Sequence, residues 1–382
     1  MKQLILSIII VFTTSVSTFS QYLDDLSFGS DSSFEIMTWN LEWFPTNGQA
    51  TIDSVITIIE ALDVDIIAIQ EIDNETLFAQ LLDGLEGYEG HYQVSSYLEV
   101  GYIYKSATIQ VDTIYEIYNT SIYNRPFPRK PLLMDFEFMG EEMVVINSHL
   151  KCCGNGYMDL NDPWDEETRR YDACNLLSTF VEENYPETKV ILVGDFNDLI
   201  QESGSSNVFE VFINDSSSYK IVDMEIAEGP QSNWSYPSWP SHLDHIIVTN
   251  ELFDAVEDEN AIIETLLIED NMIGGFNTYE NYISDHRAVA LKIPVNEINL
   301  GIADHFEDAI QFKVFPNPAK DVISISSDQT IDQVRIFDQM GKCISTEHHL
   351  FNKISLSTFS SGIYIIEIRS KGNYLRKKLI IR

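Results

Sequence analysis

The chain reads Val190-Ile191-Leu192-Val193-Gly194-Asp195-Phe196-Asn197 near its middle, and this stretch is the clearest guide to its fold. Four apolar residues predict a buried strand, and a carboxylate and a carboxamide follow where that strand ends. Asp195 and Asn197 are two residues apart, so on a strand their side chains point to the same side. We therefore predict a functional site just beyond this strand.

The composition predicts a large globular protein with an acidic surface. The chain has 382 residues, 44 % of them hydrophobic, which is enough for one large domain and a smaller one. Its formal net charge is −37, and such a surface repels nucleic acid unless cations screen it or bind locally. Residues 313–382 differ, with 11 Lys and Arg against six Asp and Glu. This change in charge predicts two separate units.

The N-terminus has the pattern of a secretory signal peptide. Lys2 supplies a positive charge, and residues 4–12 form an apolar stretch too short to span a bilayer. Thr18 and Ser20 suit a cleavage site, so we assign residues 1–20 to the signal peptide. No later segment is long and apolar enough to span a membrane, so no stable membrane insertion is expected.

Export permits disulfides between the four cysteines, which are Cys152, Cys153, Cys174 and Cys343. Cys152 and Cys153 are adjacent and would not normally bond to each other. Cys174 is the expected disulfide partner of one of them, which leaves a free thiol. A buried free thiol and a metal site are the alternatives, although adjacent cysteines lack the spacing of zinc ligands.

Strands alternate with helices early in the chain, and hairpins follow in the middle. The apolar patterns predict strands at 34–40, 64–70, 101–105, 109–118, 132–138, 143–147, 190–193, 243–249 and 286–293. Helical spacing predicts helices at 52–62, 75–85 and 166–183. This mixture predicts an α+β fold, a mixed β-sandwich with helices outside.

The chain is expected to end in a second, smaller domain. Residues 295–311 lack strong periodicity, and we interpret them as a linker. Short β-runs at 322–325, 334–337 and 363–368 are separated by turns, which is typical of a small sandwich. The predicted domains are therefore 21–294 and 312–382.

Polar residues recur at the predicted strand ends, and together they suit phosphodiester hydrolysis. That reaction needs a hard cation, carboxylates to hold it, a group that activates water, and donors to the phosphoryl oxygens. The residues are Asn40, Glu42, Glu71, His149, Asp195, Asn197, Asp244, His245, Asp285 and His286. One of them alone would be a cap or a surface residue, but the whole set predicts one site.

Over residues 34–294 the chain resembles the endonuclease/exonuclease/phosphatase superfamily, which has the fold of deoxyribonuclease I. The resemblance rests on the order of Trp39-Asn40, Gln70-Glu71, Asn147-Ser148-His149-Leu150, Gly194-Asp195-Phe196-Asn197, Leu243-Asp244-His245-Ile246 and Ser284-Asp285-His286. Each motif alone is weak, whereas the shared order is specific. The resemblance implies a four-layer α/β sandwich, in which two packed mixed β-sheets are flanked by helices.

The resemblance also implies a metal site. Glu71 would be the main ligand of Mg²⁺ or Mn²⁺, and Asn40, Glu42 and Asp285 would complete the site. The acidic stretch 159–167 departs from the better-known members of the superfamily. We interpret it as a solvated loop pinned by a disulfide, with a second cation site, for Ca²⁺, as the alternative.

The remaining matched residues would act on the phosphate. His149 and His286 would flank it, with Asp244 hydrogen-bonding His286 and fixing its tautomer. Asp195 would orient or activate the attacking water, and Asp195 and His286 are both candidates for the general base. Asn197 would donate to a phosphoryl oxygen. Arg129 resembles a phosphate-contacting arginine of the superfamily, with an ordinary surface arginine as the alternative.

An aromatic stretch, Trp234-Ser235-Tyr236-Pro237-Ser238-Trp239, precedes the motif at Leu243. Its rings would either pack a loop or stack on a base or sugar of the substrate. The sequence shows no long basic patch beside the site.

The last unit resembles the C-terminal type A sorting domain of type IX secretion, a small Ig-like β-sandwich found in Bacteroidetes. The likeness rests on Pro316-Asn317-Pro318-Ala319, on Gly341-Lys342 and on the basic end at Lys377-Lys378. It implies the type IX secretion machinery as a partner, and a secreted or cell-surface location. A carbohydrate-binding or adhesion module is the alternative.

We therefore predict a secreted, divalent-metal-dependent phosphodiesterase, an endonuclease or exonuclease acting on extracellular nucleic acid. A phosphatase, or a sphingomyelinase-type or inositol-phosphate-type phosphoesterase of the same fold, is the first alternative. A non-catalytic surface binding protein is the second.

Overall fold

The computed structural model divides into two compact units, Met1–Gly301 and Ile302–Arg382. The described residues are 26–295 without 93–98 and 203, and 312–382 without 328–330, 332, 338–342, 348–352 and 371–372. The predicted signal peptide 1–20 lies outside them, as does the predicted linker 295–311 apart from Val295. Within the described parts, no helix has the length and apolar character that crossing a membrane requires.

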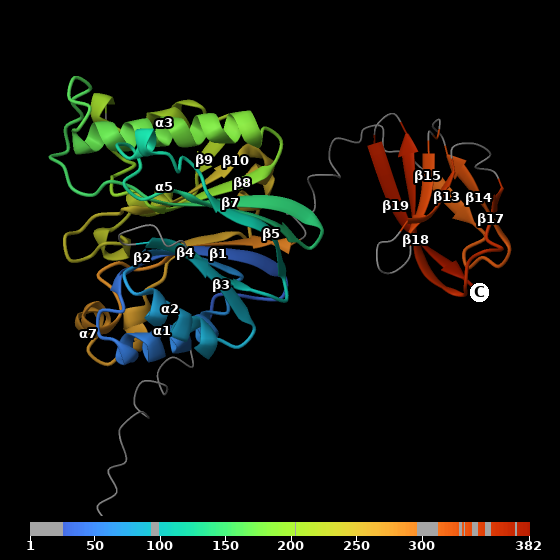
Figure 1. Ribbon diagram of the computed structural model, residues 1–382, viewed down its shortest axis with the longest axis horizontal. Helices are drawn as coiled ribbons and strands as arrows, with labels where there is room; N and C mark the ends of the chain where they lie inside the picture. Colours follow the sequence, from blue (N-terminus) through green and yellow to red (C-terminus); the bar gives the residue numbers. More distant parts are fainter. Residues whose placement is uncertain are drawn as a thin grey trace, which may run out of the picture. The chain divides into compact units, whose positions relative to one another are not determined.

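The larger unit contains two six-stranded mixed sheets (Figure 1). The first has the order β11-β12-β1-β2-β4-β3, and the second has the order β5-β6-β7-β8-β10-β9. Strands of the first are β1 (Ser33–Phe44), β2 (Ile66–Ile72), β3 (Tyr88–Tyr92), β4 (Glu99–Lys105), β11 (Ile262–Thr265) and β12 (Val289–Pro294). Those of the second are β5 (Ile109–Glu116), β6 (Leu132–Phe138), β7 (Glu141–His149), β8 (Lys189–Asp195), β9 (Tyr219–Ile221) and β10 (Asp244–Thr249).

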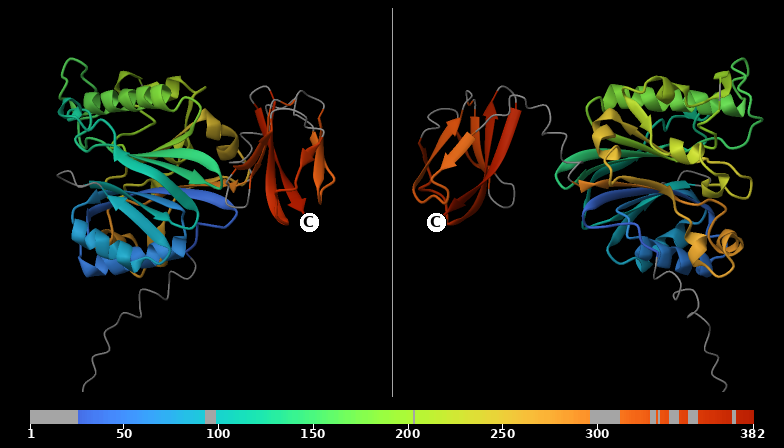
Figure 2. Two further views of the ribbon diagram at one scale, coloured as in Figure 1. Left: turned by 45° about the vertical axis from the view of Figure 1, so that its right-hand side comes forward. Right: turned by 180° about the vertical axis from the view of Figure 1, so that it is seen from behind.

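Helices cover the outer face of each sheet, so the unit has four layers (Figures 1 and 2). The first sheet packs on α1 (Gln49–Leu62), α2 (Glu75–Gly84) and α7 (Phe276–Tyr282). The second packs on α3 (Glu166–Asn184) and α4 (Glu210–Asn214), while α5 (Met224–Ala227) and α6 (Phe253–Val256) are single turns. The predicted four-layer sandwich is confirmed.

Central strands carry mostly apolar residues because both of their faces are buried. In β2, Ile66 and Ala68 point into the core between the two sheets, whereas Ile67 and Ile69 point toward the helices. A continuous apolar run in the sequence therefore marks a strand that lies in the middle of the sandwich.

The predicted site residues meet at one edge of the sandwich because of the strand pairing. β1 runs parallel to β2, and β7 runs parallel to β8, so each pair ends together. In the second pair His149 is level with Asp195. β10 runs antiparallel to β8 and therefore begins where β8 ends, which places Asp244 opposite Asp195.

The smaller unit is a β-sandwich, as predicted. One sheet has the order β13-β14-β17 and the other has the order β16-β15-β18-β19. The strands are β13 (Phe312–Phe315), β14 (Val322–Ser327), β15 (Gln333–Phe337), β16 (Cys343–Glu347), β17 (Ile354–Ser355), β18 (Gly362–Ser370) and β19 (Asn373–Ile381). Ile323, Val334, Ile366 and Leu379 are fully buried in its core.

A buried carboxyl pair near the start of β1 should make the stability of the larger unit depend on pH. Glu35 is fully buried, and its N–H donates to Asp65 Oδ2 at 3.1 Å. Burial, together with the charge of Asp65, raises the pKa of Glu35 from 4.5 to about 7. The folded protein thus keeps a proton that the unfolded chain releases, so stability falls as the pH rises from about 4.5 to about 7.

We expect Glu35→Gln to remove this part of the pH dependence. The unfolding free energy of the variant relative to wild type should rise by about 1 kcal/mol or more between pH 5 and pH 8, because only wild type loses this stabilising proton. Denaturant unfolding with a metal chelator present measures it, and Glu60→Gln, at an exposed position of α1, is the control. Parallel curves for Glu35→Gln and wild type would contradict the prediction.

Candidate active site

A pocket of about 520 Å³ opens at the edge where the parallel strands end. All predicted site residues line it except Asn40, Asp244 and His245, which are buried. The lining residues are Glu42, Trp43, Glu71, Arg129, His149, Cys152, Cys153, Asp195, Asn197, Tyr236, Trp239, Ser241, Leu243, Asp285 and His286.

The backbone is irregular where it enters the pocket. Glu42 and Glu71 have positive φ values of 36° and 64°, and the pairing of β1 with β2 shifts register between Asn40 and Phe44. Such bulges re-aim side chains near active sites. Gly194 has φ 143°, and a Cβ there would lie 1.8 Å from the carbonyl oxygen of Ser148, so only glycine lets β8 approach β7 this closely.

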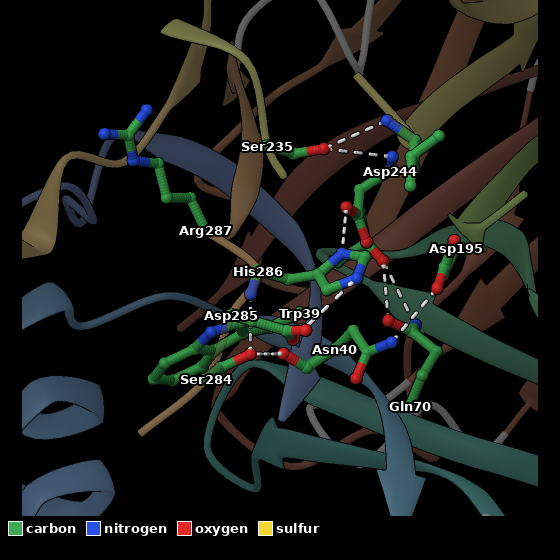
Figure 3. Close-up of polar contacts among 12 residues, drawn as sticks. Trp39, Asn40, Gln70, Asp195, Ser235, Asp244, Ser284, Asp285, His286 and Arg287 are labelled. Carbon is green, nitrogen blue, oxygen red and sulfur yellow. Dashed lines mark hydrogen bonds and ion pairs between the residues drawn. The ribbon is translucent and has the colours of Figure 1, made fainter. Parts of the chain in front are cut away.

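Asn40 joins the two main carboxylates of the pocket, Glu71 and Asp195, and Figure 3 shows its contact with Asp195. Its Nδ2 donates to Glu71 Oε1 at 3.1 Å and to Asp195 Oδ2 at 3.0 Å. Its Oδ1 accepts from the N–H of Glu42 at 2.9 Å. The other oxygen of Glu71 accepts from the N–H of Trp43 at 3.1 Å. In this structure the Asn40 amide thus positions Glu71 and Asp195.

The carboxyl groups of Glu42, Glu71 and Asp285 lie on one side of the pocket, and they fit a divalent cation. Glu42 Oε2 accepts from the N–H of Asp285 at 3.1 Å. Burial, with the charges of Asp285 and Glu71, raises the pKa of Glu42 to about 7, and burial also raises the pKa of Asp285. Among the described residues none of the three forms an ion pair with a Lys or Arg. Crowded carboxylate oxygens of this kind are the ligands that Mg²⁺ prefers.

His286 lies between Asp244 and Asp285 (Figure 3). Its Nδ1 donates to Asp244 Oδ2 at 2.7 Å, and its Nε2 lies 4.0 Å from Asp285 Oδ1. Burial disfavours the charged ring, but the charges of Asp244, Asp195 and Asp285 outweigh it and raise the pKa of His286 to about 10. His286 is therefore an imidazolium at neutral pH, with one N–H available to the pocket.

His149 and Asp195 form the floor of the pocket. His149 Nε2 lies 3.5 Å from Asp195 Oδ2 and 3.8 Å from Glu71 Oε1. Burial, with the charge of Arg129, holds the pKa of His149 well below its usual range. Burial also raises the pKa of Asp195 to about 7, in spite of the charge on His286. Asp195 can therefore take up and release a proton near neutral pH.

Two donors in the pocket have nitrogen atoms without protein partners. In the described structure, Asn197 Nδ2 and Arg129 Nε are buried and have no hydrogen-bond acceptor. Arg129 is held in place because its Nη1 donates to the carbonyl of Leu150 at 3.1 Å. An anionic oxygen in the pocket would satisfy such donors.

Sequence reasoning missed the residues that hold this site from behind. Ser284 Oγ donates to the carbonyl of Asn40 at 2.6 Å and accepts from the N–H of His286 at 2.9 Å. Ser235 Oγ accepts from the N–H of Asp244 at 3.2 Å. Ser284 belongs to the motif Ser284-Asp285-His286, and this motif was the one sequence signal that could have identified it.

His245 points away from the pocket, although it stands among the predicted strand-end residues. Its Nδ1 donates to Asp223 Oδ2 at 2.6 Å, and its Nε2 donates to the carbonyl of Asp198 at 2.9 Å. Both ring nitrogens thus face acceptors, which requires a charged ring. Burial opposes this charge, but Asp223 raises the pKa of His245. The fully buried His245–Asp223 pair is part of the support beneath the site.

The predicted disulfide of Cys174 is wrong, because Cys152, Cys153 and Cys174 are all free thiols. Cys174 faces the core beneath α3, whereas the two adjacent cysteines line the pocket. Glu167 anchors the loop instead, because it accepts from the N–H of Asn155 at 2.7 Å. Acidic groups of residues 165–167 lie close together, and Ca²⁺ binding there stays a prediction.

Comparison with known proteins places this geometry in a family. Residues 37–286 match the model of the Endonuclease/Exonuclease/phosphatase family, and residues 313–382 match that of the secretion system C-terminal sorting domain. The first match spans more than half of the chain, so the chain belongs to the endonuclease/exonuclease/phosphatase family. It is a metal-dependent phosphoester hydrolase. Its sorting domain implies export by the type IX secretion machinery to the cell surface or beyond.

Solved structures share the fold at low sequence identity. TDP2 of D. rerio in complex with single-strand DNA product is 15 % identical, and the match covers 69 % of this chain and 100 % of that chain with a TM-score of 0.52. A form of the same protein humanised by 14 mutations is 14 % identical, with 69 % and 99 % covered and a TM-score of 0.50. No curated protein matches the sequence. The structural likeness concerns the fold alone.

Proposed function

We propose that this enzyme hydrolyses phosphodiester bonds of extracellular nucleic acid, with Mg²⁺ or Mn²⁺ as its cation. The export domain supports an extracellular substrate. The observation that carries the proposal is the presence of exposed aromatic rings on the pocket that holds the carboxyl groups and the histidines. Trp239 is 78 % exposed and Trp43 is 48 % exposed. Large aromatic side chains that are exposed to solvent beside a phosphate site are suited to stacking on nucleic-acid bases.

Tyr236 connects this aromatic rim to the catalytic groups. Its ring centroid lies 4.8 Å from that of His286, at an interplanar angle of 39°. A base or sugar placed against Trp239 would therefore lie next to the phosphate that His286 faces. A small phosphate monoester offers nothing for these rings to contact.

We assign the cation to Glu71, with Glu42 and Asp285 beside it and Asn40 holding Glu71 in position. The bound cation would polarise a phosphoryl oxygen and stabilise the leaving group. Asp195 would orient the attacking water, because its carboxyl group can accept a proton near neutral pH.

The remaining groups would bind the phosphate. The charged His286 and the neutral His149 would contact it from two sides, and Asn197 and Arg129 would donate to its oxygens through nitrogens that lack protein partners. Asp244 would keep His286 charged and correctly oriented.

A phosphatase, sphingomyelinase-type or inositol-phosphate-type enzyme is the second candidate, and the net charge of −37 favours it. An acidic surface repels long polyanions more strongly than small ones, and the repulsion falls with salt. The aromatic rim argues for nucleic acid, and a direct comparison of substrates separates the two.

We expect the full chain with Mg²⁺ or Mn²⁺ to cleave single-stranded DNA, RNA or plasmid DNA faster than sphingomyelin or inositol phosphates. Trp239→Ala should raise KM for a DNA oligonucleotide about tenfold, because stacking contributes about 1–3 kcal/mol per base. Trp164→Ala is the matched control, since Trp164 is 66 % exposed and does not line the pocket. A preference for lipid or inositol substrates would overturn the nuclease proposal.

A further inference from the structure

Cys152 and Cys153 lie on the wall of the pocket and have no part in the chemistry assigned to it. Cys153 Sγ donates a hydrogen bond to Cys152 Sγ at 3.2 Å. Cys153 is exposed and Cys152 is half-buried, so solutes reach the pair. Adjacent residues on regular backbone point apart, and this contact therefore needs a structural cause.

One cause is an irregular turn directly after the pair. Cys153 has φ 71°, which is uncommon for a residue with a side chain. Gly154 follows with φ 121°, and a Cβ there would lie 2.4 Å from a carboxylate oxygen of Glu167. The packing of Glu167 thus requires a glycine, and it keeps the turn closed over the two cysteines.

A second cause is a buried arginine that holds the backbone on both sides of Cys152. Arg170 is 3 % exposed, and its Nη1 donates to the carbonyls of Lys151 and Cys153 at 2.7 Å each. Its Nε donates to Asp198 Oδ2 at 2.7 Å, which fixes the guanidinium. The folded protein therefore holds the two sulfur atoms together.

Hydrogen bonding makes the two sulfurs unequal. Cys152 Sγ accepts from Lys151 Nζ at 3.6 Å as well as from Cys153 Sγ, whereas Cys153 Sγ acts as a donor. The hydrogen bond to Cys152 raises the pKa of Cys153, so this thiol keeps its proton. Cys152 is thus the nucleophile of the pair, and Cys153 is the thiol that can resolve a mixed disulfide.

We propose that Cys152 and Cys153 form a redox-active dithiol that closes to a vicinal disulfide on the pocket wall and thereby changes phosphate affinity. The oxidant is another disulfide, of a protein or a small thiol. The Cys152 thiolate attacks one sulfur of that disulfide and expels a thiolate. Cys153 then loses its proton, and its sulfur attacks Cys152 Sγ and expels the second thiolate. Two protein thiols are oxidised, and one disulfide is reduced to two thiols.

The adjacency of the two residues suits a reversible bond. Cα atoms joined by a trans peptide lie about 3.8 Å apart, which is shorter than the roughly 4.4–6.8 Å usual across a disulfide. The resulting strain makes the bond easy to reduce, as in regulatory disulfides. Cys174 does not compete, because it is fully buried in the core.

Closing the disulfide replaces two S–H groups by an S–S bond on the wall of a pocket that receives an anionic phosphate. We expect the affinity of the oxidised protein for inorganic phosphate to differ at least threefold from that of the reduced protein. The expectation that the pocket binds phosphate rests on the proposed function, whereas formation of the disulfide does not.

The test equilibrates the full chain with reduced or oxidised glutathione, then measures intact mass, the linked peptide and calorimetric binding of inorganic phosphate. We expect the oxidised protein to lose two hydrogens, to link Cys152 to Cys153 and to bind phosphate with a changed affinity. Cys153→Ser should instead keep one glutathione, while Cys174→Ala should respond like wild type.

Glutathione adducts or unmodified thiols on oxidised wild type would overturn the proposal, as would a linked pair with unchanged phosphate affinity. Neither readout requires turnover. A failure of the nuclease assay would therefore be distinguishable from a failure of the dithiol.

Discussion

Replacing Glu71 with glutamine should lower kcat at least a thousandfold and abolish tight Mg²⁺ binding. Glu71 is one of the three carboxyl groups on one side of the pocket, and Asn40 and the N–H of Trp43 hold it in place. Glutamine keeps the size of the side chain but removes the charge that balances the cation. A thousandfold loss corresponds to about 4 kcal/mol of transition-state stabilisation, which is in the range expected when a catalytic cation is lost.

Kinetics with a DNA oligonucleotide and calorimetric titration with Mg²⁺ would measure this effect. Glu75→Gln is the matched control, because Glu75 is an exposed glutamate in the first turn of α2, four residues along the chain. Chelating the metal should bring wild type down to the level of Glu71→Gln. A Glu71→Gln enzyme with wild-type rate and metal affinity would refute the metal-site assignment.

The second large effect is expected at Asp244. Asp244→Asn should lower kcat by about three orders of magnitude while the fold is retained, as expected when a histidine loses the carboxylate that orients it. The carboxylate of Asp244 supplies the first of the charges that raise the pKa of His286. Without that charge, burial lowers the pKa of His286, and the ring loses its proton at a lower pH.

The loss of rate in Asp244→Asn should depend on pH, and its direction follows from the pKa of His286. Wild-type His286 is charged below about pH 10. In Asp244→Asn the charged form persists only to a lower pH, so the remaining activity should rise as the pH falls. Rate profiles of both proteins, with Asp254→Asn at an exposed position of α6 as the control, would measure it. Identical profiles for Asp244→Asn and wild type would contradict the proposed pairing.

Strands in the middle of each sheet were predictable from sequence, whereas most strands at the edges were not. The exception in the larger unit is the edge strand β5, which was predicted at 109–118. β2, β7, β8 and β10 carry apolar runs because both of their faces are buried, and β1 was predicted from its alternating pattern. The edge strands β3, β9 and β11 lie at the ends of the strand orders and were missed. An edge strand has half of its backbone hydrogen bonds and little buried surface, so its local pattern is weak.

The site could be predicted as a set of residues but not as an arrangement. The motifs of the resemblance contain every carboxylate and histidine of the pocket apart from Glu42. The sequence alone could not show that His245 turns away from the pocket, or that Cys174 stays in the core while Cys152 contacts Cys153. These outcomes depend on which face of a strand or helix is buried, and against what.

By itself the sequence determined the order of buried strands and the polar residues that end them, because a buried strand needs apolar residues close together in the sequence. Gly194-Asp195-Phe196-Asn197 could therefore be recognised as the end of a strand with a function. Only the tertiary structure decided which polar atoms meet. Asn40 reaches Asp195 across 155 residues of chain, and Ser284 reaches Asn40 across 244. Such contacts follow from the pairing of distant strands, which no local pattern encodes.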